Sequence, residues 1–401
     1  MKALTAVSCE SSCDSKRRVR VILISSVQPV KGVGGELLLY RHLIERTDVN
    51  CHVVPVGGRR SVFSRILSAA ARNGCSRLVA DWKFLTARLG LSGSLPKCRD
   101  HCSTSVVLTV AHGDGYLAAM RYARRGNLPL VSMFHDWWPD CARVHGPFQS
   151  AIERSFFDLH RSSSGALMVC NGMLEAIGAT PVSSVLYPIA SIPATRHERQ
   201  GRGDREPFRV GYAGNLCEYG PMVGELLQLT LGQKNVRLEV RGRHPLWSAS
   251  LCADAMNANC WNGFSQGAEL ENWLASLDAL LVPMAFDPRL KRRMMTSFPS
   301  KLTEFAQYRK PIIVWGPEYC SAVKWAQAEQ KALCVVTPNP ASVVAAIDEL
   351  QGSPETMARL SAKAAGSAAR EFCPERIQRQ LLDVLNGVLD AHCLRAGVAR
   401  N

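Results

Sequence analysis

Short apolar runs rich in β-branched residues alternate with longer stretches of helical periodicity along most of this 401-residue chain. The runs are continuously apolar, and strands of that kind belong to parallel sheets whose two faces are both covered. We therefore predict an α/β protein with two doubly wound parallel sheets. The strands are expected at residues 19–25, 51–56, 105–111, 128–134 and 166–170, and then at 208–212, 237–241, 277–283, 311–315 and 333–337. The helices are expected at 35–46, 115–124, 222–229, 269–275, 301–308 and 374–391.

A polar stretch without periodicity, PATRHERQGRGDRE at residues 193–206, separates the two halves and is predicted to be a hinge linker. A disordered tail is expected over 1–17, one α/β domain over 18–192 and a second α/β domain over 207–373. A last helix within 374–395 is expected to dock on the first domain. Its apolar stripe consists of Ile377, Leu381, Leu382, Leu385 and Val388.

The charge balance narrows the possible partners. With 48 Lys and Arg against 34 Asp and Glu, the formal charge is +14. Such an excess is typical of proteins that meet nucleic acid, anionic lipid or phosphorylated small molecules. The basic clusters, such as Arg59-Arg60, lie in no recognisable nucleic-acid module. We expect no nucleic-acid partner and favour peripheral contact with an anionic membrane.

Localisation is predicted from the cysteines and from the apolar runs. Fifteen cysteines are scattered singly, which fits reduced thiols and a cytoplasmic protein. No apolar run approaches the roughly 18 residues of a membrane span. The segment ending at Cys9 resembles an export signal, but its apolar stretch is shorter than the roughly 7–15 residues required, so a tail is favoured. Cys98 and Cys102 flank a histidine with a hint of metal spacing but lack a second ligand pair, so no metal site is expected.

Ligands of open α/β sheets bind beyond the carboxyl ends of the strands, so the loops after strands are the candidate sites. Residues 31–36, KGVGGE, follow the first strand and form either a phosphate cradle or a plain turn. The fourth strand is followed by His135, Asp136, Trp137 and Trp138. Tryptophan faces suit sugar rings, and the polar groups suit hydroxyls. The alternative is a buried His–Asp pair with surface aromatics. A similar His112-Gly-Asp114 follows the third strand but is the weaker candidate.

In the second half, Pro299 and Ser300 are residues that commonly start a helix. Lys301 and Glu304 then lie three residues apart on one face of that helix. A helix N-terminus, an ammonium and a carboxylate at one spot suit a diphosphate and ribose hydroxyls. The alternative is an ordinary helix with an ion pair worth about 0.2–0.5 kcal/mol.

Taken together, these features resemble a retaining GT-B glycosyltransferase of the family 4-like kind, over residues 18–391. The order and spacing of five motifs carry the resemblance. They are VGG at 33–35, His135-Asp136, YAGN at 212–215, LDALLVP at 277–283, and PSKLTEF at 299–305 followed by KPII at 310–313. The resemblance implies two Rossmann-like domains that face each other across a cleft, with the acceptor bound by the first (18–192) and the nucleotide sugar by the second (207–373).

The resemblance also implies roles for individual residues. The donor is expected to be a nucleotide sugar and the acceptor a hydroxyl of a glycan or of a lipid-linked molecule, with transfer that retains configuration and needs no metal or other cofactor. His135 and Glu304 would be catalytic, with His135 near the transferred sugar and Glu304 on the donor ribose. The donor would be bound by Gly34, Gly35, Gly214, Asn215, Arg243, Ser300, Lys301 and Glu304, and the acceptor by Asp136, Trp137 and Trp138.

The chain departs from the family pattern at two places. Thr296 stands where many members carry a first carboxylate, eight residues before Glu304, so that carboxylate is either missing or replaced by the backbone and hydroxyls of Thr296-Ser297. Asn215 and Tyr219 fall near the positions of a phosphate-binding arginine and lysine, for which Arg243 is expected to compensate. Two alternatives therefore stay open. One is a sugar-nucleotide epimerase of the same fold, and the other is a degenerate domain that binds nucleotide sugar or glycan in a polysaccharide-assembly complex.

Overall fold

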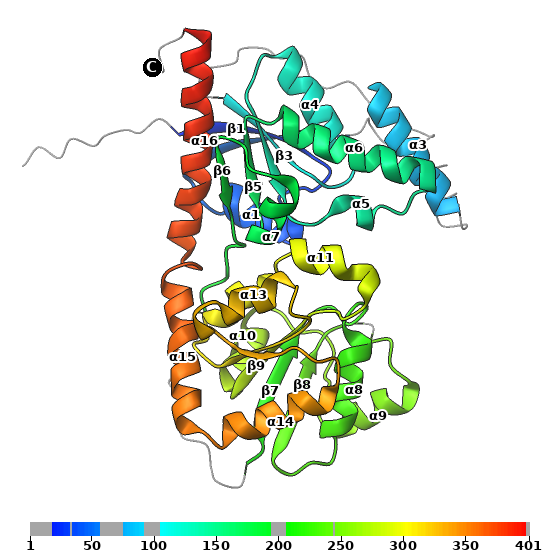
Figure 1. Ribbon diagram of the computed structural model, residues 1–401, viewed down its shortest axis with the longest axis vertical. Helices are drawn as coiled ribbons and strands as arrows, with labels where there is room; N and C mark the ends of the chain where they lie inside the picture. The colour runs from blue at the N-terminus through cyan, green and yellow to red at the C-terminus, as the bar shows by residue number, and fades with distance from the viewer. Residues whose placement is uncertain are drawn as a thin grey trace, which may run out of the picture.

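The chain forms two α/β domains stacked along the long axis of the molecule in a computed structural model (Figure 1). The structure describes residues 18–32, 34–56, 75–91, 105–193, 206–243 and 245–397. The predicted tail, nearly all of the linker, Arg59-Arg60 and the Cys98–Cys102 motif lie outside these residues. Among the helices of the described segments, none has the length and apolarity needed to cross a bilayer.

The first domain is built on a six-stranded parallel sheet with the order β2-β1-β3-β4-β5-β6. Every residue of β3, β4 and β5 is buried, which explains their continuously apolar sequences. The strands are β1 Val19–Ser25, β2 Val49–Pro55, β3 Ser105–Val110, β4 Leu130–Phe134, β5 Gly165–Met168 and β6 Ser183–Val185. The helices are α1 Gly35–Leu43, α3 Ser76–Leu89, α4 Gly115–Arg125, α5 Trp138–Cys141, α6 Gly146–Ser162 and α7 Asn171–Ile177.

The second domain repeats this plan with a five-stranded parallel sheet in the order β11-β10-β9-β7-β8. Its strands are β7 Phe208–Ala213, β8 Val236–Arg241, β9 Ala279–Pro283, β10 Ile312–Trp315 and β11 Leu333–Val335. Its helices are α8 Gly220–Thr230, α9 Ala249–Asn257, α10 Gly267–Ser276, α11 Lys291–Thr296, α12 Ser300–Ala306, α13 Ser321–Gln327, α14 Pro340–Gln351 and α15 Pro354–Ala369. All ten predicted strands are present, with shifts of up to two residues at either end.

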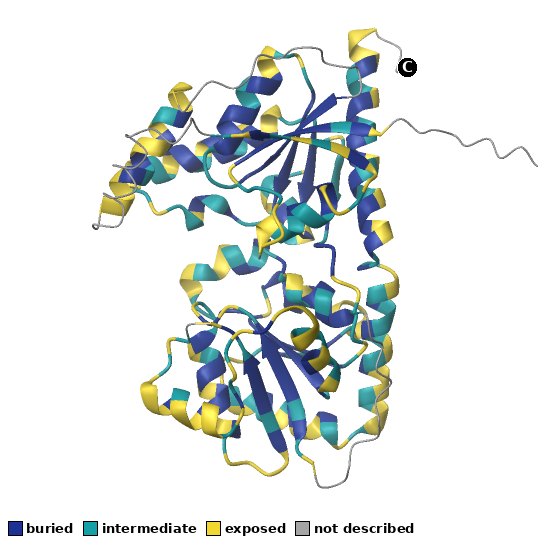
Figure 2. Ribbon diagram, turned by 180° about the vertical axis from the view of Figure 1, so that it is seen from behind, coloured by how far each residue is buried: buried dark blue, intermediate teal, exposed yellow. Residues whose placement is uncertain are grey.

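The last helix, α16 Pro374–Ala396, returns to the first domain and runs along its sheet (Figure 1). Its inner face appears as a buried stripe beside the sheet in Figure 2. That face is apolar because it covers one side of β1, β3 and β5, and its fully buried residues are Ile377, Leu381, Leu385, Val388 and Leu389. Gly165 of β5 is small for this reason, since a Cβ atom there would lie 2.6 Å from Val388 Cγ2. The first domain is thus completed by the end of the chain.

The two connections between the domains meet at one aromatic cluster, here called the hinge cluster. Tyr187 lies on the first connection and Phe372 on the second, with ring centroids 5.2 Å apart. Phe298 of the second domain lies 4.7 Å from Tyr187. Trp325 stacks on Phe372 at 5.3 Å. Both connections between the domains therefore pack into the hinge cluster.

Candidate active site

The carboxyl ends of the two sheets face each other, and the strand order of each sheet reverses next to its first strand. β1 lies between β2 and β3, and β7 lies between β8 and β9. Such switch points open a crevice beyond the strands. The space between the domains contains a cavity of about 420 Å³, here called the interdomain cleft. The predicted site residues that line it are Gly34, Gly35, His135, Asp136, Ser300, Lys301 and Glu304.

Helix α12 supplies the second-domain wall of the cleft. Its apolar face, Leu302 and Phe305, is buried in the domain core, so Lys301 and Glu304 are turned toward the cleft. Burial lowers the pKa of the Lys301 ammonium, and the carboxylate of Glu304 acts in the opposite direction. Gly214 lies directly against this lysine, because a Cβ atom there would be 3.2 Å from Lys301 Cε.

Glu304 is paired with a residue that sequence reasoning missed. Arg41 of helix α1, in the first domain, donates from Nη1 to Glu304 Oε1 at 2.8 Å. The same guanidinium donates to the carbonyl of Ile189 and to the Ser191 hydroxyl, so it also holds the first interdomain connection. The Arg41 side chain is 12% exposed and that of Glu304 is 29% exposed. An interdomain ion pair therefore closes one side of the cleft.

His135 and Asp136 form the first-domain wall where β4 ends. Burial lowers the pKa of His135 to about 4, although Asp136 opposes the shift. The imidazole is therefore neutral at pH 7 and offers one donor and one acceptor nitrogen. Asp136 Oδ1 accepts a hydrogen bond of 2.9 Å from the Ser297 hydroxyl of the second domain. This loop thus contacts both the cleft and the opposite domain.

Further ion pairs lie near the domain boundary: those of Arg292 join the two domains, and that of Arg293 lies within the second domain. Arg292 pairs with Asp140 and with Glu153 of the first domain. Arg293 Nη1 lies 3.2 Å from Glu218 Oε1. Burial raises the pKa of Glu218, and Asp136 raises it further, whereas Arg293 lowers it. Arg292 and Arg293 do not line the cleft, and its lysine and arginine side chains among the described residues are Lys301 and Arg41.

A second cavity of about 310 Å³, here called the middle cavity, adjoins the cleft at the switch point of the first sheet. The two cavities share Gly35, His135 and Asp136. The middle cavity is also lined by Ser26 after β1 and His112 after β3. Histidine, carboxylate and hydroxyl groups around one space suit a ligand with several hydroxyls.

The loops after β1 and β3 are fixed to each other by Ser26. Its hydroxyl donates to Asp114 Oδ1 at 3.1 Å and accepts from the amide of Gly115 at 2.8 Å. Gly113 has φ of +68°, and a Cβ atom there would meet the Ser26 side chain at 2.6 Å. The weaker candidate of the sequence, His112-Gly-Asp114, is therefore part of the same site as His135.

Two sequence predictions need correction, and a third residue lies at the rim of the cleft. Trp137 is 3% exposed and packs against Phe156 and Phe157, so it offers no ring face to a ligand. Arg243 does not line the cleft itself, but its guanidinium lies 4.0 Å over the ring of Phe264, which does. Thr296 is buried, and its hydroxyl donates to the Arg292 carbonyl, so it does not stand in for a carboxylate.

Two other predicted residues lie at the edge of the site. The side chain of Asn215 accepts from the Cys217 amide at 2.8 Å and is absent from the cleft lining. Trp138 is half-buried and its ring is tilted against that of His112, with ring centroids 4.2 Å apart and an angle of 45°. His112 and Trp138 therefore form one aromatic pair at the edge of the middle cavity.

The fold is found in solved glycosyltransferase structures, although no protein-family model and no curated protein sequence matches the chain. HepE of Anabaena in complex with UDP-glucose aligns over 92% of this chain and 100% of its own, with a TM-score of 0.58 and 14% identity. Sucrose-phosphate synthase of Thermosynechococcus elongatus aligns over 93% and 100%, with a TM-score of 0.59 and 12% identity. TarM aligns over 71% of this chain, which spans 55% of TarM, with a TM-score of 0.51 and 12% identity. The predicted GT-B fold is confirmed.

Proposed function

We propose that the protein is a glycosyltransferase that uses a nucleotide-diphosphate sugar. The observation that carries the proposal is the interdomain cleft, which brings Lys301, Glu304 and His135 together at the carboxyl ends of both sheets. An anionic donor needs cations, and ribose needs hydrogen-bond acceptors; the cleft offers both. HepE, which has the same fold, has been solved with UDP-glucose.

In this proposal the donor ribose binds Glu304. Its Oε1 is held by Arg41, which leaves Oε2 for the ribose hydroxyls. The diphosphate lies near Lys301, with the amides of Gly34 and Gly35 on the opposite wall. Arg41 supplies part of the positive charge that a phosphate-binding arginine and lysine, which the sequence lacks, would provide for the diphosphate. No metal takes part, because fixed cations offset the charge that develops on the departing diphosphate.

The reaction transfers the sugar to an acceptor hydroxyl with retention of configuration. The hydroxyl oxygen attacks the anomeric carbon from the face of the leaving group while the bond from that carbon to the diphosphate oxygen breaks. The nucleoside diphosphate leaves with the electron pair, and the hydroxyl proton passes to its phosphate oxygen. Neutral His135 holds a hydroxyl of the transferred sugar by hydrogen bonding, since its pKa near 4 leaves it unprotonated at pH 7.

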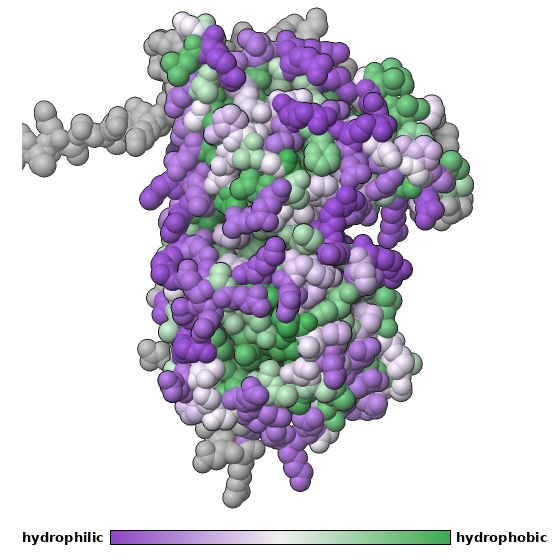
Figure 3. Space-filling model, in the orientation of Figure 1, coloured by the Kyte–Doolittle hydropathy of each residue, from purple (hydrophilic) through white to green (hydrophobic). Residues whose placement is uncertain are grey.

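We further propose that the enzyme works at an anionic membrane, with helix α3 against the lipid. The outer face of α3 exposes Leu78, Leu85 and Leu89 by 61%, 38% and 63%. Arg77 and Arg88 flank this stripe. An apolar stripe bordered by cations is typical of helices that lie in a membrane interface. In Figure 3, apolar side chains gather at the outer edge of the first domain, where Figure 1 has α3.

Calorimetric titration with UDP, GDP and ADP tests the donor site. We expect one nucleotide to bind, and Glu304→Ala to weaken its binding by at least about tenfold, because a charge-assisted hydrogen bond is worth roughly 1.5–3 kcal/mol. Glu225→Ala, which removes an exposed carboxylate from α8, is the matched control and leaves the affinity unchanged.

Unchanged affinity in Glu304→Ala would contradict the site. Incubation of the protein with the sugar form of the bound nucleotide then separates the remaining alternatives. An isomerised sugar nucleotide would identify an epimerase. Tight binding without turnover on any acceptor would identify a binding domain.

A further inference from the structure

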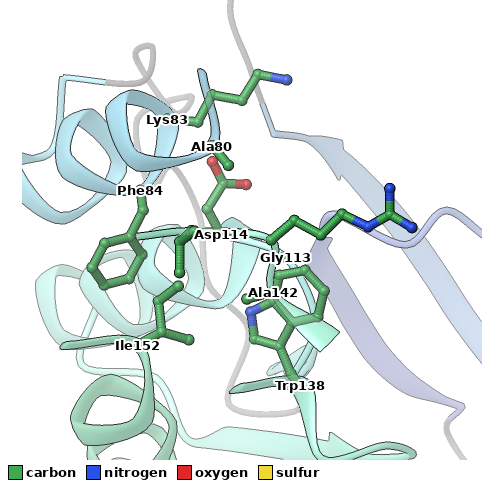
Figure 4. A pocket seen from close by; sticks show the side chains of 10 residues that line it. Ala80, Lys83, Phe84, Gly113, Asp114, Trp138, Ala142 and Ile152 are labelled. Carbon is green, nitrogen blue, oxygen red and sulfur yellow. The ribbon is translucent and has the colours of Figure 1, made fainter. Parts of the chain in front are cut away.

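A third cavity lies in the first domain, next to the middle cavity and away from the interdomain cleft. It has a volume of about 190 Å³ and is here called the outer pocket. Helix α3 contributes Ala80 and Phe84, α6 contributes Ile152, and the α5 region contributes Trp138, Ala142 and Val144. Figure 4 shows Phe84, Ile152 and Trp138 around the space, with the Asp114 carboxylate on the other side.

The walls of the outer pocket are held in place by buried packing and hydrogen bonds. Phe84 is 5% exposed and makes an edge-to-face contact with Phe148, with ring centroids 6.4 Å apart. Buried Asp81 pins α3 to the segment after α5, since its carboxylate accepts from the His145 amide at 3.0 Å and lies 2.5 Å from the His145 ring. The helix that carries Ala80 and Phe84 is thereby fixed against the rest of the domain.

The outer pocket is a neighbour of the middle cavity, because residues of the two linings contact each other. The His112 ring lines the middle cavity, and its partner Trp138 lines the outer pocket. Asp114 also lines the outer pocket and is bonded to Ser26 of the middle cavity. His112 follows β3 and His135 follows the neighbouring strand β4, and adjacent strands lie about 5 Å apart. One sugar ring in the middle cavity is therefore large enough to contact both His112 and His135.

The chemistry of the walls selects what enters. Most of the lining is aliphatic or aromatic, and the polar groups Asp114, Lys83 and Arg143 come from its edge. Lys83 and Arg143 are exposed, so their charges stay in solvent. An apolar cavity of about 150 Å³ is large enough to hold benzene. The outer pocket therefore fits one aromatic ring or a short alkyl segment better than a second sugar.

We propose that the acceptor carries an apolar group next to its glycosyl unit, and that the outer pocket binds this group while the middle cavity presents the hydroxyl to the donor. The inference rests on the proposed function, which it deepens. It favours a lipid-linked or aryl-linked acceptor over a bare glycan. Phe84, Trp138 and Ile152 determine acceptor specificity, and they do not contact the nucleotide.

Paired glycosides test the proposal. Phenyl, n-hexyl and methyl glycosides of glucose, galactose, mannose and N-acetylglucosamine are titrated into the full chain in the presence of UDP. For at least one sugar we expect the phenyl or hexyl glycoside to bind at least about tenfold more tightly than the methyl glycoside. A preference for phenyl alone would assign an aryl-linked acceptor, and equal gains for both would assign an alkyl chain.

Ala142→Phe fills the outer pocket and is expected to abolish the preference while leaving UDP affinity unchanged; Ala80→Leu does the same from α3. Ala249→Phe, on exposed α9 of the second domain, is the matched control. Equal binding of methyl and apolar glycosides, or a preference that survives both fillings, would overturn the proposal. Failure of the unmodified chain to bind UDP, GDP or ADP, with the apolar preference intact, would instead contradict the proposed donor site.

Discussion

Burial controls the protonation of two neighbouring histidines, His42 and His135. His42 of α1 is fully buried, where its Nδ1 lies 3.3 Å from Gln378 Oε1 of α16, and Gln378 donates back to the His42 carbonyl at 3.1 Å. Burial lowers the pKa of His42 from 6.5 to about 3, and a proton on His135 opposes its charging further. The folded protein therefore holds neutral imidazoles that the unfolded chain would protonate.

This difference makes the free energy of unfolding depend on pH. Between pH 6.5 and 3, His42 is protonated in the unfolded chain but neutral in the folded protein. The contribution of His42 to the free energy of unfolding is therefore fully present above pH 6.5 and decreases as the pH falls. Each such group contributes about 1.4 kcal/mol per pH unit. Urea unfolding at pH 7, 6, 5 and 4 measures how the free energy of unfolding changes with pH. We expect this slope to be smaller by about 1.4 kcal/mol per pH unit in His42→Gln. His52→Gln, on exposed β2, is the matched substitution, and equal slopes in all three proteins would contradict the prediction.

At the same scale, the sequence could predict which residues meet within one element but not across the domain boundary. Lys301 and Glu304 share a helix face, so their approach to one cleft follows from their spacing. Arg41 carries no such signal, because its partner Glu304 lies on another domain. Trp137 and Trp138 are adjacent in sequence, and only the packing of Phe156 decides which ring is buried. Thr296 was misjudged because its hydroxyl is satisfied within its own helix.

At the scale of elements, helix α7 of the first domain packs against α11 of the second. Cys170, at the start of α7, directs its thiol toward the Thr296 carbonyl at 3.3 Å. Gly172 allows the approach, because a Cβ atom there would overlap the carbonyl oxygen of Met295. The two helices therefore fix how closely the walls of the cleft can approach.

Gly172→Ala is expected to force these helices apart. Overpacking of this kind costs about 1–3 kcal/mol, and here the domains can relieve it by opening. We expect a larger radius of gyration by small-angle X-ray scattering and weaker nucleotide binding. Gly366→Ala is the matched control, since its Cβ would lie 3.5 Å from the flexible end of Arg370 on α15. Identical scattering from Gly172→Ala and the unmodified protein would show that the contact does not limit closure.

The strands were predictable as elements because their apolar runs are continuous, and α12 because Pro299-Ser300 precede it. Helices α3 and α6 were not predicted, although both shape the outer pocket. Strand β6, Ser183–Val185, was also missed, because its three residues are half-buried and two of them are serines. Periodicity thus identified the buried scaffold better than the partly exposed elements that surround the acceptor.

The whole molecule carries a charge of +14 and has one exposed apolar stripe on α3. We expect it to float with vesicles that contain phosphatidylglycerol and not with phosphatidylcholine alone, and to be released by salt, which screens surface charge. Replacing Leu78, Leu85 and Leu89 by glutamate is expected to reduce binding by at least about tenfold. Leu394→Glu, which changes a leucine that is 83% exposed on α16, is the control. Equal flotation with neutral vesicles, or by the triple variant, would contradict membrane contact through α3.

The position of α16 affects how the protein folds during its synthesis. A ribosome makes the first sheet early, but the helix that covers it emerges only after the whole second domain. At about 5–20 residues per second, the apolar face of β1, β3 and β5 stays open for on the order of ten seconds. During that interval it is a ready surface for a chaperone or for a neighbouring nascent chain. The first domain is therefore synthesised first but completes its folding last, when α16 covers its sheet.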